Sequence, residues 1–195
     1  DGAPPAGSRL LFEQPSPPLA EVVRDINKFS NNVMAEQLFL SLALPAPAAS
    51  PPPEPAAAAS TPAAAPQAPS PGVRAEDARL LLQRWLANRF GEATLREVVV
   101  DNGSGLSRDA RLSAQLLARL LQSAWASGVM PELMSSLPVS GTDGTLRRST
   151  APQGRAHLKT GSLRDVAAVA GYVWSTSGRR HVLVAIVNHP QAGGA

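Results

Sequence analysis

Apolar residues recur at a helical spacing near the start of the chain. Leucine, valine and isoleucine side chains stand at positions 19, 22, 23 and 26, which predicts one face of a helix. Pro17 and Pro18 suit the opening turn of this helix, with Ser16 as its cap. A second helix is predicted directly after "FSNN", with Ser30 as its N-cap. The pattern therefore predicts two helices in series, joined by a short polar break.

Two further helices are predicted over residues 73–90 and 111–128. Gly91 is expected to end the first, because glycine commonly terminates helices. Ser113 is expected to cap the second, and Gly128 to stop it. The residues of the first that are expected to face inward are Leu81, Trp85 and Leu86.

The last third of the chain carries a different pattern, which is typical of strands. A short strand is predicted at Val98–Val100, and three longer ones at 154–163, 166–176 and 180–188, with "SGRR" as a hairpin turn between the last two. Helices followed by such a meander predict an α+β or α/β domain with an antiparallel sheet flanked by helices.

Residues 43–72 interrupt the periodic pattern. This segment holds ten of the 19 prolines and almost no charge. Such a composition cannot bury a core or maintain a helix, so we predict a disordered or polyproline-like insertion loop within one domain.

Composition excludes several classes of function. The net charge is only +3, and the basic residues are dispersed, which argues against a nucleic-acid partner. The chain has no cysteine and no run of about 18 apolar residues, which argues against disulfides, thiolate metal sites and a transmembrane segment. Its three histidines show no metal-ligand spacing, so no metal or cofactor is implied.

The sequence "HLKTG" contains one of only two lysines among 18 basic residues. Lysine differs from arginine in having a compact ammonium whose pKa shifts readily. Lys159, Thr160 and Gly161 on a strand would present a cation, a hydroxyl and an approachable backbone, which suits a carboxylate and an added peptide strand. The alternative is a solvated lysine at the end of a strand.

Ser30 and Asn32 form the second candidate pair. Serine and asparagine are common at helix starts, so capping alone explains them. The same geometry would also direct a hydroxyl and a carboxamide into an adjacent cleft. Ser-x-Asn upstream and Lys-Thr-Gly on a later strand are two of the three motifs of penicillin-interacting serine enzymes.

The residues around these motifs narrow the class of penicillin-interacting enzyme that the chain resembles. Residues 16–38, 101–113, 141–148 and 157–173 together resemble the D-alanyl-D-alanine carboxypeptidase/endopeptidase family, the low-molecular-mass class C penicillin-binding proteins. The resemblance covers nearly the whole chain except the Pro/Ala-rich insertion. It implies a serine transpeptidase/β-lactamase-like fold, peptidoglycan stem peptides and β-lactam antibiotics as partners, and a periplasmic or cell-envelope location.

The resemblance also implies a role for each motif residue. Ser30 relays a proton toward the leaving amine, Asn32 holds the substrate amide, and Lys159 supplies positive field. Thr160 binds the terminal carboxylate, Gly161 lets the substrate approach, and the backbone N–H of Ser162 serves the oxyanion. "DNGSGLS" (101–107) is expected to form a wall of the cleft, and "GTDGTLRR" (141–148) a tight loop near the strand that carries Lys159.

The family's Ser-x-x-Lys motif has no match in these 195 residues. The only lysines are Lys28 and Lys159, and the residues three positions before them are Asp25 and Ala156. We therefore expect residues 1–195 to be the C-terminal part of the transpeptidase-like domain, incomplete at both ends, with the nucleophile outside this chain.

Other interpretations remain open at this point. A serine β-lactamase would share the motifs, but no acidic residue can be singled out to activate a deacylating water. A non-catalytic envelope protein that keeps only the binding cleft fits the missing nucleophile directly. The motifs could also coincide by chance in a helical adaptor.

Overall fold

The computed structural model describes residues 5, 7–9, 11–44 and 72–192. Two helices come first, α1 (Leu19–Phe29) and α2 (Asn32–Ser41), and α3 (Ala75–Phe90) follows the predicted insertion. That insertion lies outside the described residues except for positions 43, 44 and 72. The later elements are η1 (Glu92–Arg96), β1 (Val98–Val99), β2 (Arg111–Leu112), α4 (Ala114–Trp125), α5 (Met130–Ser136), η2 (Gly144–Leu146), β3 (Ala156–Leu163), β4 (Val166–Trp174) and β5 (Arg180–Asn188).

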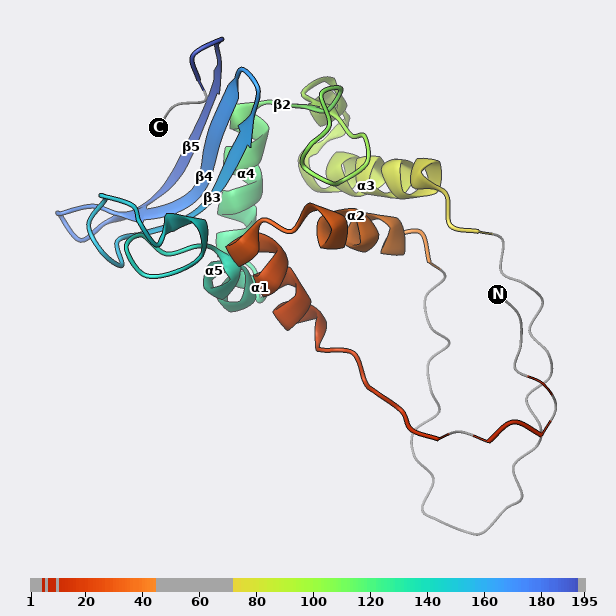
Figure 1. Ribbon diagram of the computed structural model, residues 1–195. Helices are drawn as coiled ribbons and strands as arrows, with labels where there is room; N and C mark the ends of the chain where they lie inside the picture. The colour runs from red at the N-terminus through yellow and green to blue at the C-terminus, as the bar shows by residue number, and fades with distance from the viewer. Residues whose placement is uncertain (1–4, 6, 10, 45–71, 193–195) are drawn as a thin grey trace.

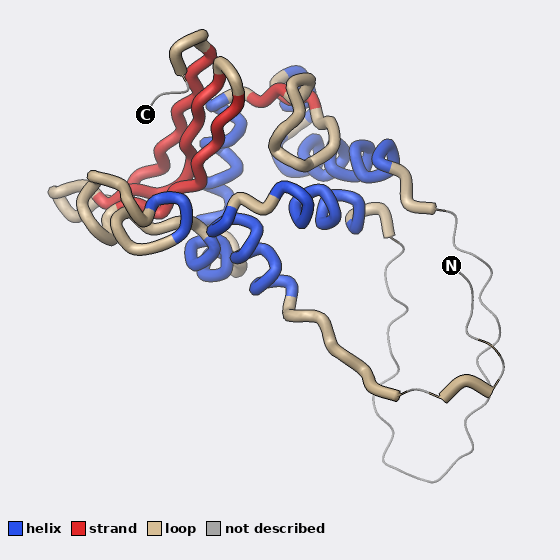
Figure 2. The backbone as a smooth tube through the Cα atoms, in the orientation of Figure 1, coloured by secondary structure: helices blue, strands red, loops and turns tan. Residues whose placement is uncertain are grey.

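The predicted antiparallel meander is confirmed. Strands β3, β4 and β5 pair in sequence order, and a separate two-stranded ribbon joins β1 to β2. The β3 and β4 backbones approach closely at Gly171, where a Cβ atom would lie 2.2 Å from the His157 carbonyl oxygen. Figure 2 shows the three long strands gathered at one end of the molecule, with the helices along and beyond them.

Helix α4 packs along one face of the three-stranded sheet, and α1 and α5 lie together near its end (Figure 1). The core between α4 and the sheet is centred on Leu121, Leu137 and Tyr172. The Tyr172 hydroxyl donates to the Leu121 carbonyl at 2.7 Å, so the single tyrosine ties β4 to the helix. Helices α2 and α3 contact each other away from the sheet.

Two of the predicted helix caps are wrong. Helix α1 begins at Leu19 after Pro18, so Ser16 lies too far upstream to reach the first turn. Ser30 ends α1 in the left-handed conformation, and Asn31 caps α2 by accepting from the Met34 N–H at 3.0 Å. Only the residue directly before the first helical position can make this bond, and the chain places Asn31 there.

The other predictions about the helices are partly right and partly wrong. Ser113 caps α4 as predicted, by accepting from the Leu116 N–H, and Gly91 ends α3. Leu86 is buried as predicted, but Leu81 and Trp85 are 43% and 50% exposed, so the assignment to the inward face was wrong for these two residues. Small residues share that face: besides Leu86, the buried positions of α3 are Ala78 and Ala87.

Candidate functional site

The break between α1 and α2 orients Ser30. Its φ and ψ are 51° and 48°, and the following N–H, that of Asn31, bonds back to the Ile26 carbonyl at 3.1 Å. This left-handed residue closes α1 and turns the chain before α2 begins. Ser30 therefore does not cap α2 as predicted. Its hydroxyl is directed at strand β3 instead.

Lys159 meets that hydroxyl. Its ammonium donates to Ser30 Oγ and to the Thr160 carbonyl oxygen, the latter at 2.7 Å. The two motifs predicted from the sequence, 129 residues apart, thus come into direct contact. Lys159 is half-buried, and this burial lowers the pKa of its ammonium below the usual lysine value. A cation with a lowered pKa beside a hydroxyl can both stabilise negative charge and take part in proton transfer.

Asn32 supports the loop that follows β1. Its Nδ2 donates to the Ser104 carbonyl at 2.6 Å, and Asn102 Oδ1 accepts from both the N–H and the hydroxyl of Ser104. From the other side, the Arg79 guanidinium of α3 donates to the Asp101 carbonyl at 2.8 Å. The "DNGSGLS" segment is therefore held by α2 and α3, next to Asn32.

The end of β3 carries the remaining predicted residues. Thr160 is partly buried, whereas Gly161 and Ser162 are exposed. Among the described residues, β3 pairs along its length only with β4, since its other side forms a single bridge, between His157 and Val139. An open strand edge beside a lysine and a threonine suits an extended peptide with a terminal carboxylate.

The predicted tight loop near Lys159 is confirmed and adds residues that the sequence analysis missed. Thr145 Oγ1, in the "GTDGTLRR" loop, lies 2.9 Å from Thr160 Oγ1. Two residues earlier, Asp143 pairs with Lys28 at 2.6 Å. The sequence did carry a signal for Lys28: it is the other of the two lysines, and it precedes Ser30 by two positions. The ion pair itself joins residues 115 apart and could not be read from spacing.

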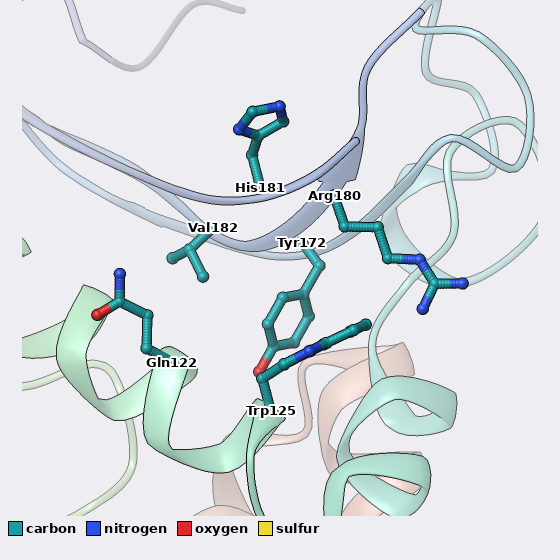
Figure 3. A pocket seen from close by; sticks show the side chains of 6 residues that line it. All are labelled: Gln122, Trp125, Tyr172, Arg180, His181 and Val182. Atoms are coloured by element: carbon teal, nitrogen blue, oxygen red, sulfur yellow. The ribbon is translucent and has the colours of Figure 1, made fainter. Parts of the chain in front are cut away.

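A cavity of about 460 Å³ lies elsewhere, between α4 and the start of β5. Figure 3 shows Trp125, Tyr172 and Val182 directed into the space between helix and strand, while His181 points to the opposite side of the strand. The Arg180 guanidinium lies 5.1 Å and 4.7 Å from the ring centres of Trp125 and Trp174. This cavity does not include the residues that surround Lys159.

Comparison with solved structures defines the class of fold. The chain superposes on penicillin binding protein 4 from Haemophilus influenzae with a TM-score of 0.69 and 22% identity, covering 91% of this chain and 35% of that one. A peptidoglycan endopeptidase from Bdellovibrio bacteriovorus gives a TM-score of 0.58 and 18% identity, covering 88% and 37%. The predicted α+β fold of the serine transpeptidase type is confirmed.

Sequence comparison identifies the family. The profile of the D-Ala-D-Ala carboxypeptidase 3 (S13) family matches residues 67–194, so the chain belongs to this family. A D-alanyl-D-alanine carboxypeptidase from Actinomadura sp. is 30% identical over 96% of this chain and 31% of its own length. The D-alanyl-D-alanine carboxypeptidase DacB of Haemophilus influenzae is 26% identical, covering 97% and 36%. The chain thus spans about a third of the length of these relatives.

Proposed function

We propose that this chain supplies the proton-relay and substrate-binding part of a serine D,D-carboxypeptidase/endopeptidase. The substrates are D-Ala-containing peptide bonds of peptidoglycan stem peptides, and β-lactams acylate the same site. The observation that carries the proposal is the contact between Lys159 and Ser30, which joins the two motifs beside an open strand edge. Membership of the S13 family supports the same chemistry.

The nucleophile comes from a Ser-x-x-Lys motif outside residues 1–195. Its hydroxyl gives its proton to the lysine of the same motif as the oxygen attacks the carbonyl carbon of the D-Ala-D-Ala amide and forms a tetrahedral intermediate. When the C–N bond breaks, the departing amine takes a proton through Ser30, and D-Ala leaves. Water then attacks the acyl-enzyme ester, which releases the shortened peptide as a carboxylate and restores the serine hydroxyl.

Residues of this chain assist that sequence at three points. The Lys159 ammonium donates to Ser30 Oγ, so it can polarise and reprotonate the relay hydroxyl. The Thr160 hydroxyl donates to the terminal carboxylate within the field of Lys159, and Gly161 lets the peptide lie along the edge of β3. The N–H of Ser162 donates to the oxyanion, a role worth roughly 3 kcal/mol of transition-state stabilisation in other hydrolases.

Asn32 has a second task beside its proposed contact with the substrate amide. Its Nδ2 holds the 101–107 loop through the Ser104 carbonyl, which leaves the carboxamide oxygen to meet a substrate N–H. The loop and the substrate would then be tied to one side chain.

Peptidoglycan lies in the cell envelope, and the enzyme is proposed to act there, in the periplasm of a bacterium that has one. Among the described residues, no helix has the length and apolar character needed to cross a bilayer.

A non-catalytic peptidoglycan-binding protein is the second candidate. The lack of a Ser-x-x-Lys motif in these 195 residues favours it, since the cleft alone would then bind a stem peptide without cleaving it. Catalysis separates the two proposals, because only the first releases D-Ala.

The test measures release of D-Ala from a stem pentapeptide by the full-length protein that contains this chain. We expect release by the unchanged protein and a loss of about 10²-fold or more in the Lys159→Arg variant, because a planar guanidinium cannot replace the ammonium in the relay. Arg179→Lys replaces one positively charged side chain with another in the exposed β4–β5 turn. It is the matched control and should keep full activity. Binding of the peptide without any D-Ala release would favour the non-catalytic protein.

A further inference from the structure

Three segments far apart in the sequence form a closed ring of contacts around the proposed site. Residues 28–30 end helix α1, residues 143–145 form the start of η2, and residues 159–160 belong to β3. Ser30 contacts Lys159, Thr160 contacts Thr145, and the 143–145 segment returns to Lys28. The family resemblance assigned roles in the first and third segments but none in the second.

The link between Lys28 and Asp143 closes this ring. The Lys28 side chain is only 11% exposed and donates to Asp143 Oδ2 at 2.6 Å and to the Leu137 carbonyl at 2.7 Å. Asp143 Oδ1 accepts from the Val139 N–H at 2.8 Å. Burial raises the pKa of Asp143, but the Lys28 and Val139 hydrogen bonds outweigh it and hold this pKa below the usual value. Asp143 is therefore anchored on both sides, by Lys28 and by the Val139 N–H.

Gly144 brings the turn directly against α1. Its φ is +55°, and a Cβ atom there would lie 2.8 Å from the Lys28 carbonyl oxygen and 3.1 Å from Pro138 Cβ. Only glycine combines this left-handed backbone with such a close approach. The next residue, Thr145, is consequently fixed in position relative to Lys28 and, through it, to Ser30.

The fixed turn places one hydroxyl against another. Thr145 Oγ1 and Thr160 Oγ1 are 2.9 Å apart, and each hydroxyl carries a single proton. If Thr145 donates to Thr160, the proton of Thr160 must point in another direction. Thr160 can then give that proton to a ligand carboxylate while it accepts from Thr145.

We propose that Thr145 is a positioning residue that directs the Thr160 hydroxyl proton toward the carboxylate of the substrate. The inference rests on the proposed function and adds a determinant of substrate class: ligands with a free carboxylate gain from Thr145, and ligands without one do not. The Lys28–Asp143 pair and Gly144 keep the Thr145 hydroxyl within reach of Thr160.

The experiment compares acylation of the full-length protein by benzylpenicillin and by its methyl ester, which lacks the free carboxylate. Thr145→Val removes the hydroxyl at nearly constant shape, and Thr145→Ser restores it. Thr142→Val is the matched control, because the Thr142 hydroxyl bonds within its own turn, to the Ser140 carbonyl at 3.3 Å. The quantity measured is the ratio of second-order acylation rates for acid and ester.

Loss of one hydrogen bond predicts a fall of about three- to tenfold in the acid-to-ester ratio for Thr145→Val. Thr145→Ser and Thr142→Val should keep the ratio of the unchanged protein. A merely structural role would lower both rates together and leave the ratio unchanged, which would overturn the inference while the proposed function stands. If the unchanged protein forms no adduct with either compound, the proposed function fails and the inference fails with it.

Discussion

At the scale of single residues, the two lysines of an arginine-rich chain both lie at the proposed site. Lys159 is half-buried against Ser30, and Lys28 is enclosed between the Leu137 carbonyl and Asp143. A guanidinium is larger and planar, so neither position would accept arginine without rearranging its acceptors. The preference for lysine, visible in the sequence, is thus explained by geometry.

The lowered pKa of Lys159 leads to a prediction about pH. The proposed role needs the protonated ammonium, because it faces a substrate carboxylate. As pH rises through the lowered pKa, the charge disappears, so acylation by penicillin should begin to decline at a lower pH than the usual lysine pKa of about 10.4 would give. The measurement is the acylation rate of the full-length protein between pH 6 and pH 10.

The Lys159→Arg variant is the control for this profile. Its guanidinium stays charged throughout that range, so the slower residual reaction should lose the alkaline decline. An alkaline decline at the same pH in both proteins would assign the titration to a different group.

At the scale of elements, Tyr172 is the clearest tie between the sheet and α4. Its hydroxyl donates to the Leu121 carbonyl, and its ring lies 5.3 Å from that of Trp125. Burial raises the pKa of this hydroxyl. The hydroxyl therefore contributes stability that is complete below the unfolded value of about 10 and is lost as pH rises through the higher folded value.

Tyr172→Phe should weaken the contact between α4 and β4 by about 1 kcal/mol, the usual net contribution of one hydrogen bond. Hydrogen exchange of peptides from α4 and β4, measured by mass spectrometry on the full-length protein, should become faster in the variant at pH 8. Above pH 10, the difference between the two proteins should shrink, because the parent loses the same bond. Equal exchange at pH 8 would contradict the assigned role.

The elements also show what the sequence could and could not predict. Ser113 was predicted as a cap because it stands directly before an apolar helical pattern, and the same rule failed at Ser30, where the adjacent Asn31 competes for the position. The strands were predicted from β-branched runs and a turn signal. Pairing between Lys28 and Asp143 or between Thr145 and Thr160 depends on how α1, η2 and β3 pack together, which no local pattern contains.

At the scale of the whole molecule, the sheet has two unlike faces. Val182 and Val184 pack against the core beneath α4, whereas Leu183 and Val187 alternate with them and are 37% and 51% exposed. An exposed apolar sheet face is normally covered by another element. The relatives are about three times as long as this chain. The assignment of residues 1–195 to the C-terminal part of a larger catalytic domain stays a prediction.

We propose that this chain completes a site whose nucleophile lies in another part of the protein. The most direct measurement incubates the full-length protein with benzylpenicillin and locates the modified residue by tandem mass spectrometry. We expect one adduct, with the mass of intact penicillin, on the serine of a Ser-x-x-Lys motif outside residues 1–195. An adduct on Ser30, or no adduct at all, would contradict it.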